Sequence, residues 1–354
     1  MKRKFDYILL FSVIILSIFG IIMIYSSSYI WSEFKYADPY KYVKNQFIFF
    51  IIGSILMFII SKIDYKIYYK YAKVLLLICI ILLILVLIPG IGTVRNGSRS
   101  WFGIGSFGIQ PSEFTKLALI IFVSKYLCNH NKLLLMLLLT LGIFGIIMLQ
   151  PDFGTGTILV MTIFGILFIN GLSISLIIKL VILGIGGIVT LILIAPYRLS
   201  RILSFLNPWS DPLGSGFQII QSMFAIGPGG LFGLGLGNSI QKHFYLPEPQ
   251  TDFIFSIISE ELGFVGILII SILFITIIYR GFKISLNTSD KFAKNISFGI
   301  TFGLAFQCVL NLMVVVGLVP VTGVTLPFLS YGGSSLLISM ISIGIILNIS
   351  RNSN

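Results

Sequence analysis

The sequence predicts an all-α, polytopic membrane protein with about ten transmembrane helices and a large extracytoplasmic loop between helices 7 and 8. Hydrophobic residues make up 57% of the 354 residues and charged residues 10%, whereas soluble domains average about 45–50% and about 25%. The apolar residues form long uncharged runs, near the roughly 20 residues that a bilayer-crossing helix needs. One long stretch, residues 196–252, interrupts this pattern. A soluble enzyme is therefore excluded.

Six spans are visible directly as uncharged runs, over residues 7–28, 45–61, 74–94, 133–151, 153–178 and 180–197. The first run is too long for a signal peptide and lacks a cleavage site, so we expect a retained helix. A further span over 113–128 follows if Glu113 and Lys116 pair on one helix face, three residues apart.

Two more regions complete the count of ten. A span over 253–279 carries Glu260 and Glu261. The uncharged stretch 295–350 is far too long for one crossing at about 1.5 Å per residue, so we expect it to turn back near Pro320 and Pro327. All spans are expected to form a single integral membrane domain, residues 1–354.

The charged residues predict which side of the membrane each loop faces. With the N-terminus in the cytoplasm, 15 of the 24 Lys and Arg residues lie on the cytoplasmic side and 8 on the outer side, with Lys116 inside a helix. Positive residues favour the cytoplasmic side, so both termini are expected there. This topology explains the net charge of +12. No continuous basic stripe indicates a nucleic-acid partner.

The outer loop 196–252 contains QIIQSMFAIGPGGLFGLGLG, which is too apolar to remain a solvated, disordered linker. We expect this segment to pack on the helix bundle or to enter the outer leaflet. Its glycines do not indicate a nucleotide site, because no Lys-Ser or Lys-Thr pair follows and no strand and helix of a dinucleotide fold surround them.

The segment YLPEPQTDFIFSIISEELG places Asp252 where the outer loop meets the eighth helix. The simple interpretation is that Asp252 caps the N-terminus of that helix. Glu260 and Glu261 follow inside the membrane, where ionisable residues are rare and are usually functional or paired. We expect both glutamates to be paired within the bundle.

The segment GSRSWFGIGSFGIQPSEFTK leads into the fourth helix. Pro111 fits the first helical position, and Glu113 fits the first turn, where the helix dipole favours an anion. Arg95 and Arg99 beside Trp101 suit an anionic lipid headgroup at the outer surface. A plain interfacial anchor explains these three residues equally well.

Two other groups of polar residues are expected on the outer side. The segment MLQPDFGTGT places Gln150 and Asp152 at a break between the fifth and sixth helices, where a turn-forming Asp is the simple interpretation. The long loop carries four residues that are cationic or can become so. Anion binding and a solvated loop face explain them equally well; they are Arg198, Arg201, Lys242 and His243.

Taken together, the segments QPSEFTKLALI, QPDFGTG, NPWSDPLGSGFQIIQS, YLPEPQTDFIF, EELGFVG and PFLSYGGSS resemble the SEDS family, the FtsW, RodA and SpoVE proteins of bacterial cell-wall growth and division. They occur in order over nearly the whole chain, and YLPEPQTDFIF is more similar to the FtsW and SpoVE branch. The resemblance implies a peptidoglycan glycosyltransferase of the bacterial cytoplasmic membrane. Such an enzyme polymerises lipid II and works with a class B penicillin-binding protein.

The resemblance also implies roles for individual residues. The Asp of the TDF motif is regarded as catalytic in the family, and here it is Asp252. Substrate contacts are expected from Lys116 and Asp152. Other residues in the shared motifs are expected to shape the cavity or to support it structurally; they are Glu113, Gln150, Glu260 and Ser330.

The implied chemistry needs one base and one source of positive charge. A carboxylate at the outer surface can accept the proton of the attacking sugar hydroxyl, and burial at the lipid edge raises its basicity. The leaving pyrophosphate needs cations or a divalent metal ion, with Mg²⁺ or Mn²⁺ as the expected ions. The cationic candidates are Arg99, Arg198, Arg201 and Lys242, with Trp101 and His243 as further substrate contacts.

Two other classes of function fit parts of the pattern. A flippase or transporter for the lipid-linked precursor would use ten helices and intramembrane carboxylates, but the sequence shows no pair of inverted halves. A noncatalytic scaffold that recruits a periplasmic synthase is the third possibility, with small-residue helix faces such as GIGG at 184–187 as contact surfaces.

Overall fold

The computed structural model describes residues 5–352, except 96, 105–106, 130–131, 177, 180–181, 183, 185, 187–204 and 215. Most of the predicted seventh span therefore lies outside the described residues, as do Arg198 and Arg201. Those predictions remain untested.

Within the described part of the chain, a helix overlaps each of the other nine predicted spans, although the third, Lys66–Leu85, begins eight residues and ends nine residues before the predicted 74–94. The long apolar helices are α1 (Tyr7–Tyr36), α2 (Lys41–Ile60), α3 (Lys66–Leu85), α10 (Ile254–Leu286), α11 (Lys291–Val315) and α12 (Gly333–Asn352). Three further helices belong to the described part of the bundle: α4 (Pro111–Asn129), α5 (Leu133–Met148) and α6 (Phe153–Ile169). The protein is thus a multi-pass, all-α membrane protein, as predicted.

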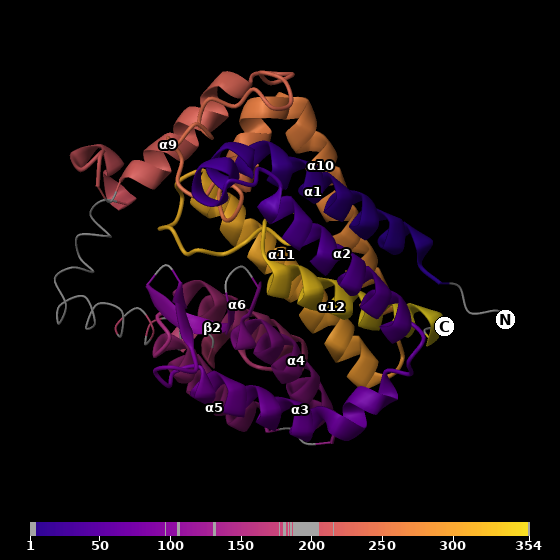
Figure 1. Cartoon of the computed structure of the whole chain (residues 1–354). Helices are drawn as coiled ribbons and strands as arrows, with labels where there is room; N and C mark the ends of the chain where they lie inside the picture. The colour runs from indigo at the N-terminus through magenta and orange to yellow at the C-terminus, as the bar shows by residue number, and fades with distance from the viewer. Residues whose placement is uncertain are drawn as a thin grey trace.

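The helices pack side by side, and both chain termini lie at the same end of the bundle (Figure 1). We call the opposite end the distal end. Helix α12 packs against α2, α11 and α4 and is the most deeply buried of the long helices. Only 22% of the spanning window is buried in each of the helices α2 and α3, and many of their large apolar side chains are exposed. They form part of the surface that faces lipid.

A small antiparallel sheet at the distal end, absent from the sequence-based expectations, precedes α4. It consists of β1 (Thr93–Arg95), β2 (Ser98–Ile104) and β3 (Phe107–Ile109), in the order β1-β2-β3. Val94 pairs with Arg99, and Phe102 pairs with Ile109. The sheet leads directly into α4, which begins at Pro111 as predicted.

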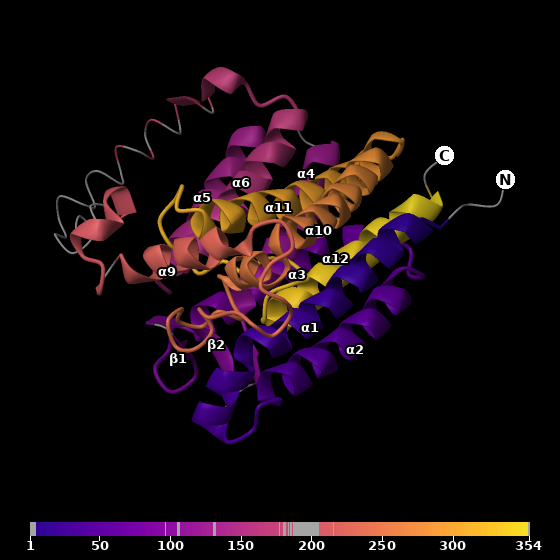
Figure 2. The same cartoon turned by 90° about the horizontal axis from the view of Figure 1, so that it is seen from above.

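The described part of the long loop folds onto the bundle. It contains η1 (Pro208–Ser210), α9 (Phe217–Ile226) and η2 (Gly227–Gly229). Helix α9 lies beside α10 and α11 at the distal end (Figure 2). Ser222 of α9 donates to the carbonyl of Val315 and shares a hydrogen bond with Ser256. The expectation that this apolar loop packs on the bundle is confirmed.

Helix α10 is broken at Gly263, whose φ of 61° and ψ of −159° are not helical. The loop fills the break. Leu234 and Gly235 donate their amides to the carbonyls of Glu260 and Glu261, both at 2.9 Å. In return, Phe264 and Val265 donate to the carbonyls of Gly230 and Leu231, at 2.9 and 3.1 Å. Backbone groups that a broken helix leaves without partners are therefore satisfied.

The turn after α11 was also predicted correctly. Residues 316–332 connect α11 to α12 without further helix and contain Pro320 and Pro327. The amide of Tyr331 donates to the carbonyl of Gln250 at 2.8 Å. This bond joins the turn to the segment that carries Asp252.

Candidate active site

Four of the segments singled out in the sequence, those that carry Glu113, Asp152, Asp252 and Tyr331, meet at one cavity of about 620 Å³ at the distal end. Its walls come from the ends of α1, α2, α4, α6 and α12, from the sheet, from residues 248–252 and from the turn before α12. The lining includes Arg95, Trp101, Gln110, Glu113, Asp152, Glu248, Asp252 and Tyr331. Segments up to 300 residues apart in the chain, from Lys35 to Ser335, thus share one site.

Asp252 lies in the wall of this cavity and does not cap the following helix. The N-cap of α10 is Phe253, and no side chain bonds to the first turn. The hydroxyl of Thr251 donates to Oδ1 of Asp252 at 2.7 Å. Burial raises the pKa of the Asp252 carboxyl, and the nearby negative charge of Glu248 adds to the increase. The simple interpretation of Asp252 as a helix cap is therefore wrong, and its carboxylate is available to a ligand in the cavity.

The backbone of Asp252 is held from α11. The side-chain amide of Asn311 donates to the carbonyl of Asp252 and to that of Val324, each at 2.8 Å. Asn311 is fully buried. One side chain therefore fixes the loop before α10 and the turn before α12 relative to each other.

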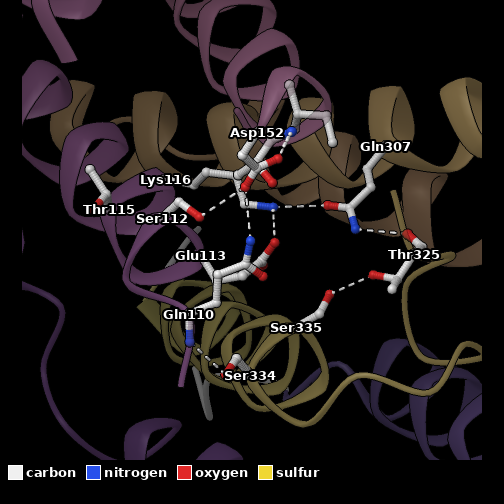
Figure 3. A network of polar contacts seen from close by, with 12 residues as sticks. Gln110, Ser112, Glu113, Thr115, Lys116, Asp152, Gln307, Thr325, Ser334 and Ser335 are labelled. Atoms are coloured by element: carbon white, nitrogen blue, oxygen red, sulfur yellow. Dashed lines mark hydrogen bonds and ion pairs between the residues drawn. The ribbon is translucent and has the colours of Figure 1, made fainter. Parts of the chain in front are cut away.

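Asp152 lines the cavity, and its carboxylate links the start of α6 to the start of α4 (Figure 3). Its Oδ1 accepts the amide of Thr155 at 3.1 Å and thereby caps α6. Its Oδ2 accepts the side-chain amide of Gln110 at 2.8 Å, and Ser112 donates to the same oxygen at 3.4 Å. The predicted turn-forming role is confirmed, and the carboxylate is already used by these three donors.

Lys116 lies beneath the cavity, where its charge is neutralised (Figure 3). Its Nζ is 2.9 Å from Oε1 of Glu113, which is the pair predicted from their spacing, and 3.1 Å from Oε1 of Gln307. Gln307 donates in turn to the carbonyl of Thr325 at 2.9 Å. Glu113 and Gln307 line the cavity, but Lys116 does not. Lys116 lines a neighbouring cavity of about 40 Å³ together with Glu113 and Gln307, and its predicted contact with substrate stays a prediction.

Of the residues that the structure describes, Arg95 and Lys35 are the cationic ones that line the cavity. The Arg95 guanidinium lies 5.0 Å from the centre of the Trp101 ring, which also lines the cavity as expected. Ser98 and Ser100 of β2 line it too, whereas Arg99 between them does not, as expected for alternating strand side chains. The expected contact of Arg99 with substrate is therefore not supported by its position.

Two other predicted substrate contacts lie away from the cavity. Lys242 is buried, with its Nζ 2.8 Å from Oε1 of Glu261 and 2.5 Å from the carbonyl of Gly237. An amine held in this way cannot reach a pyrophosphate, so the prediction for Lys242 is wrong. His243 is exposed on the loop and does not line the cavity.

The remaining predicted positions have structural surroundings. Glu260 is buried and accepts hydrogen bonds from the Ser239 hydroxyl at 2.5 Å and the Ile240 amide at 2.8 Å. We expected partners from the bundle helices, but both donors belong to the loop. Gln150 is buried and donates to the carbonyl of Leu83 at 3.0 Å. The hydroxyl of Ser330 accepts the amide of Leu326 at 2.8 Å within the turn.

Several cavity residues were missed from the sequence. Lys35, Tyr42, Glu248 and Tyr331 all line the cavity, and the rings of Tyr42 and Tyr331 meet edge to face at 4.9 Å. Tyr331 lies in the PFLSYGGSS motif, which was noted only as a turn. For Lys35 and Tyr42, which flank the turn between the first two helices, the sequence offers no comparable signal.

Two of the four carboxylates that line the cavity, Asp252 and Glu248, are near enough for the charge of Glu248 to raise the pKa of Asp252, and a divalent ion could bind there. Among the described residues no three His, Cys, Asp or Glu side chains are grouped closely enough to hold a metal ion on their own. Asp252 and Glu248 line the same cavity. A divalent ion there would need further oxygen ligands, which a bound pyrophosphate can provide.

Comparison with known proteins identifies the group to which this chain is related. The FtsW/RodA/SpoVE family, described as "Cell cycle protein", matches residues 7–354. The chain belongs to the FtsW/RodA/SpoVE family. Stage V sporulation protein E of Bacillus subtilis (strain 168) is 51% identical over 360 residues, covering 99% of this chain and 98% of that protein. The predicted SEDS resemblance is thus confirmed.

Other members of the FtsW/RodA/SpoVE family match at similar length. The probable peptidoglycan glycosyltransferase FtsW of Trichlorobacter lovleyi is 41% identical over 355 residues, covering 98% of this chain and 93% of that protein. A chain from a study titled "Structural coordination of polymerization and crosslinking by a peptidoglycan synthase complex" superposes with a TM-score of 0.79 at 30% identity. RodA of Thermus thermophilus gives 0.72 at 27% identity. Each structural match covers 99% of this chain and 98% of the other.

Proposed function

We propose that this chain is a peptidoglycan glycosyltransferase that polymerises lipid II into glycan strands and releases undecaprenyl pyrophosphate. Relatives of nearly the same length carry the name peptidoglycan glycosyltransferase. The observation that carries the proposal is the Asp252 carboxylate, which lies in the cavity wall and makes no helix cap. From this position the carboxylate could act as a base on a sugar bound in the cavity.

Asp252 is the proposed general base. The acceptor hydroxyl of one sugar attacks the anomeric carbon of the donor, and an oxygen–carbon bond forms as the bond from that carbon to pyrophosphate breaks. Asp252 takes the hydroxyl proton and later releases it to water. Its raised pKa makes the carboxylate a stronger base than an exposed Asp. The leaving pyrophosphate is a stable anion, so a second carboxylic acid is not required, unlike in glycoside hydrolysis.

Arg95 and Lys35 are the proposed cations for the leaving group. Both line the cavity, and they replace Arg99 and Lys242 among the predicted candidates. Positive groups held in advance at the place where negative charge develops lower the barrier more than mobile ones in water. A Mg²⁺ or Mn²⁺ ion held by Asp252 and Glu248 is a further proposal and would supply additional positive charge when bound.

The orientation and the partner are also proposals. The distal end faces the outside of the cytoplasmic membrane, with both termini in the cytoplasm, because this arrangement satisfies the positive-inside rule. The proposed partner is a class B penicillin-binding protein. This partner is supported by the structural relative from a peptidoglycan synthase complex, which is described as coordinating polymerization and crosslinking.

The test of the base is Asp252→Asn in the purified protein with its partner synthase and fluorescent lipid II. We expect glycan strands to disappear from gels, while Asp38→Asn polymerises at the parental rate. Asp38 is the matched control because it also lies at the distal end and does not line the cavity. Polymerisation by Asp252→Asn at the parental rate would remove Asp252 from the mechanism.

The two alternative functions, a flippase and a noncatalytic scaffold, predict different results in such assays. A flippase would move labelled lipid II across liposome membranes without joining the sugars. A noncatalytic scaffold would bind the partner, and Asp252→Asn would leave the polymerisation rate of the complex unchanged. Loss of polymerisation in Asp252→Asn, with partner binding retained, excludes both as the sole function.

A further inference from the structure

The loop before α10 has an unusual surface for a segment outside the helix bundle. Residues 212–241 contain no Asp, Glu, Lys, Arg or His. Several large apolar side chains in this region are nonetheless exposed, among them Phe232 at 77%, Leu231 at 65% and Leu236 at 54%. Contiguous apolar surface of this kind normally marks contact with a membrane or a partner.

This surface is continuous with the part of α10 that faces lipid. Beyond its break, α10 exposes Phe264, Leu268 and Ile272, each by about half of its surface. Phe264 and Val265 are also the residues whose amides donate to the carbonyls of Gly230 and Leu231. The exposed side chains of the loop therefore adjoin the first lipid-facing turns of α10.

The backbone of the loop is paired in the way that a nonpolar environment requires. Irregular backbone inside a bilayer is tolerated only where its amides and carbonyls find partners in the protein. Four backbone hydrogen bonds join residues 230–235 to the α10 break, and Gly233 donates a fifth to Gly229 at 2.7 Å. The fit leaves no room for side chains, because a Cβ on Gly233 would lie 2.2 Å from the carbonyl oxygen of Glu261.

The ionisable groups near the break are buried and have partners. Glu261 pairs with Lys242, and the exposed fraction of both side chains is 0%. Glu261 also accepts the Ser26 hydroxyl from α1 at 2.5 Å. Glu260 accepts two hydrogen bonds from residues 239 and 240. The charges next to the apolar loop surface are therefore shielded from a surrounding lipid phase.

Helix α9 has the same two-sided character. Its buried face carries Ile219, Ile220 and Ser222, which pack towards α10 and α11. Met223 and Phe224 of the same helix are partly exposed, by 37% and 48%. Trp209 meets the Phe224 ring edge to face at 5.8 Å and is itself 58% exposed. Tryptophan is enriched where a protein crosses from lipid to water.

We propose that residues 217–236 form a re-entrant segment in the distal leaflet, with Phe224, Leu231, Phe232 and Leu236 in contact with the acyl chains of bilayer lipids. An aqueous loop would expose this charge-free surface to water. The continuity of this surface with the exposed side of α10 and the complete burial of Glu260, Glu261 and Lys242 beside it favour lipid, and a protein partner is the competing outcome of the test below. The occupant is therefore the bilayer itself.

The test measures the depth of a single tryptophan in the full-length protein. Phe232→Trp is made in a background in which Trp31, Trp101 and Trp209 are replaced by Phe. The protein is reconstituted into vesicles of phosphatidylcholine and phosphatidylglycerol, with or without brominated acyl chains. Leu268→Trp, on the lipid-facing side of α10, is the lipid control. Lys44→Trp, at an exposed position after α1, is the aqueous control.

We expect brominated lipid to quench Phe232→Trp within about twofold of Leu268→Trp, with an acrylamide quenching constant at least fivefold below that of Lys44→Trp. Quenching by acrylamide but not by brominated lipid overturns the proposal and leaves the surface to a protein partner. Trp209 alone, kept in the W31F/W101F protein, is a second reporter that needs no new aromatic residue. Neither measurement uses lipid II, so its outcome is independent of the proposed enzymatic activity.

Discussion

Lys242 and Glu261 form an ion pair that is completely enclosed, with Nζ 2.8 Å from Oε1 and neither side chain exposed. The pair joins the loop to α10. It also contacts α1, because the Ser26 hydroxyl donates to Glu261 and the ring of Tyr29 lies 5.0 Å from Nζ of Lys242. The first two turns of α10, which begin next to Asp252, are therefore held at their far end by the loop and α1.

Removal of one partner of this pair is expected to cost more stability than removal of both. Lys242→Met leaves the Glu261 charge buried without a counterion, a loss of about 3–5 kcal/mol in the free energy of unfolding. Lys242→Met combined with Glu261→Gln should recover most of that loss. Thermal unfolding in detergent checks both variants. Equal unfolding temperatures for Lys242→Met and the parent would show that the pair does not exist in solution.

The raised pKa of Asp252 predicts opposite effects on activity and stability. The base must be deprotonated, so polymerisation should fall as pH drops through a value above the roughly 3.9 of an ordinary Asp. The folded protein binds this proton more tightly than the unfolded chain, so this group makes the fold less stable as pH rises between the two pKa values. Asp252→Asn should therefore unfold at a higher temperature than the parent at pH 7.5, and at the same temperature well below both pKa values. A lower unfolding temperature at pH 7.5 would contradict the assigned pKa shift.

Arg95 and Arg99 provide a matched pair, since they carry the same charge four residues apart and only Arg95 lines the cavity. Arg95→Ala should lower the polymerisation rate about 10²-fold, the size of effect seen when one group that stabilises transition-state charge is removed. Arg99→Ala should stay within about twofold of the parent. The initial rate of lipid II consumption is measured for both variants. Equal losses of rate in Arg95→Ala and Arg99→Ala would show that a position in the cavity lining does not decide which arginine contributes.

Gly233 and Gly142 form a second matched pair. An alanine at Gly233 needs a φ of 76° and places its Cβ against the Glu261 carbonyl, so it should destabilise the protein by about 2 kcal/mol or more. Gly142 lies within α5, where an added Cβ meets nothing within 4 Å. Gly142→Ala should be neutral or stabilising by about 0.5–1 kcal/mol. Folded yield and unfolding temperature compare the two; a Gly233→Ala protein as stable as Gly142→Ala would show that the loop does not enter the α10 break.

The helices could be predicted from the sequence because lipid imposes a minimum length on every uncharged run, as in α1 and α2. The α11 and α12 pair was predicted because a single helix of that length does not fit a bilayer. The sheet was missed because β1 and β3 have only three residues each, too few to show alternation. The α10 break was missed because Gly263 depends on backbone partners from residues 230–235, which no local pattern reveals.

The candidate site was predicted less completely than the fold. Asp252, Asp152, Glu113 and Trp101 were identified and share the cavity. Lys242 was misassigned because a cation in an outer loop was expected to face water, whereas its charge is neutralised inside the protein by a glutamate 19 residues later in the chain. Arg95 could be distinguished from Arg99 only once the strand register was known.

The insertion of the loop into α10 constrains how the chain is assembled during synthesis. Residues 230–235 are synthesised before residues 260–265, so the partners that the broken helix needs precede it in the chain. A circular permutant opened between α9 and α10 reverses this order, and we expect it to insert into membranes less efficiently than the parent.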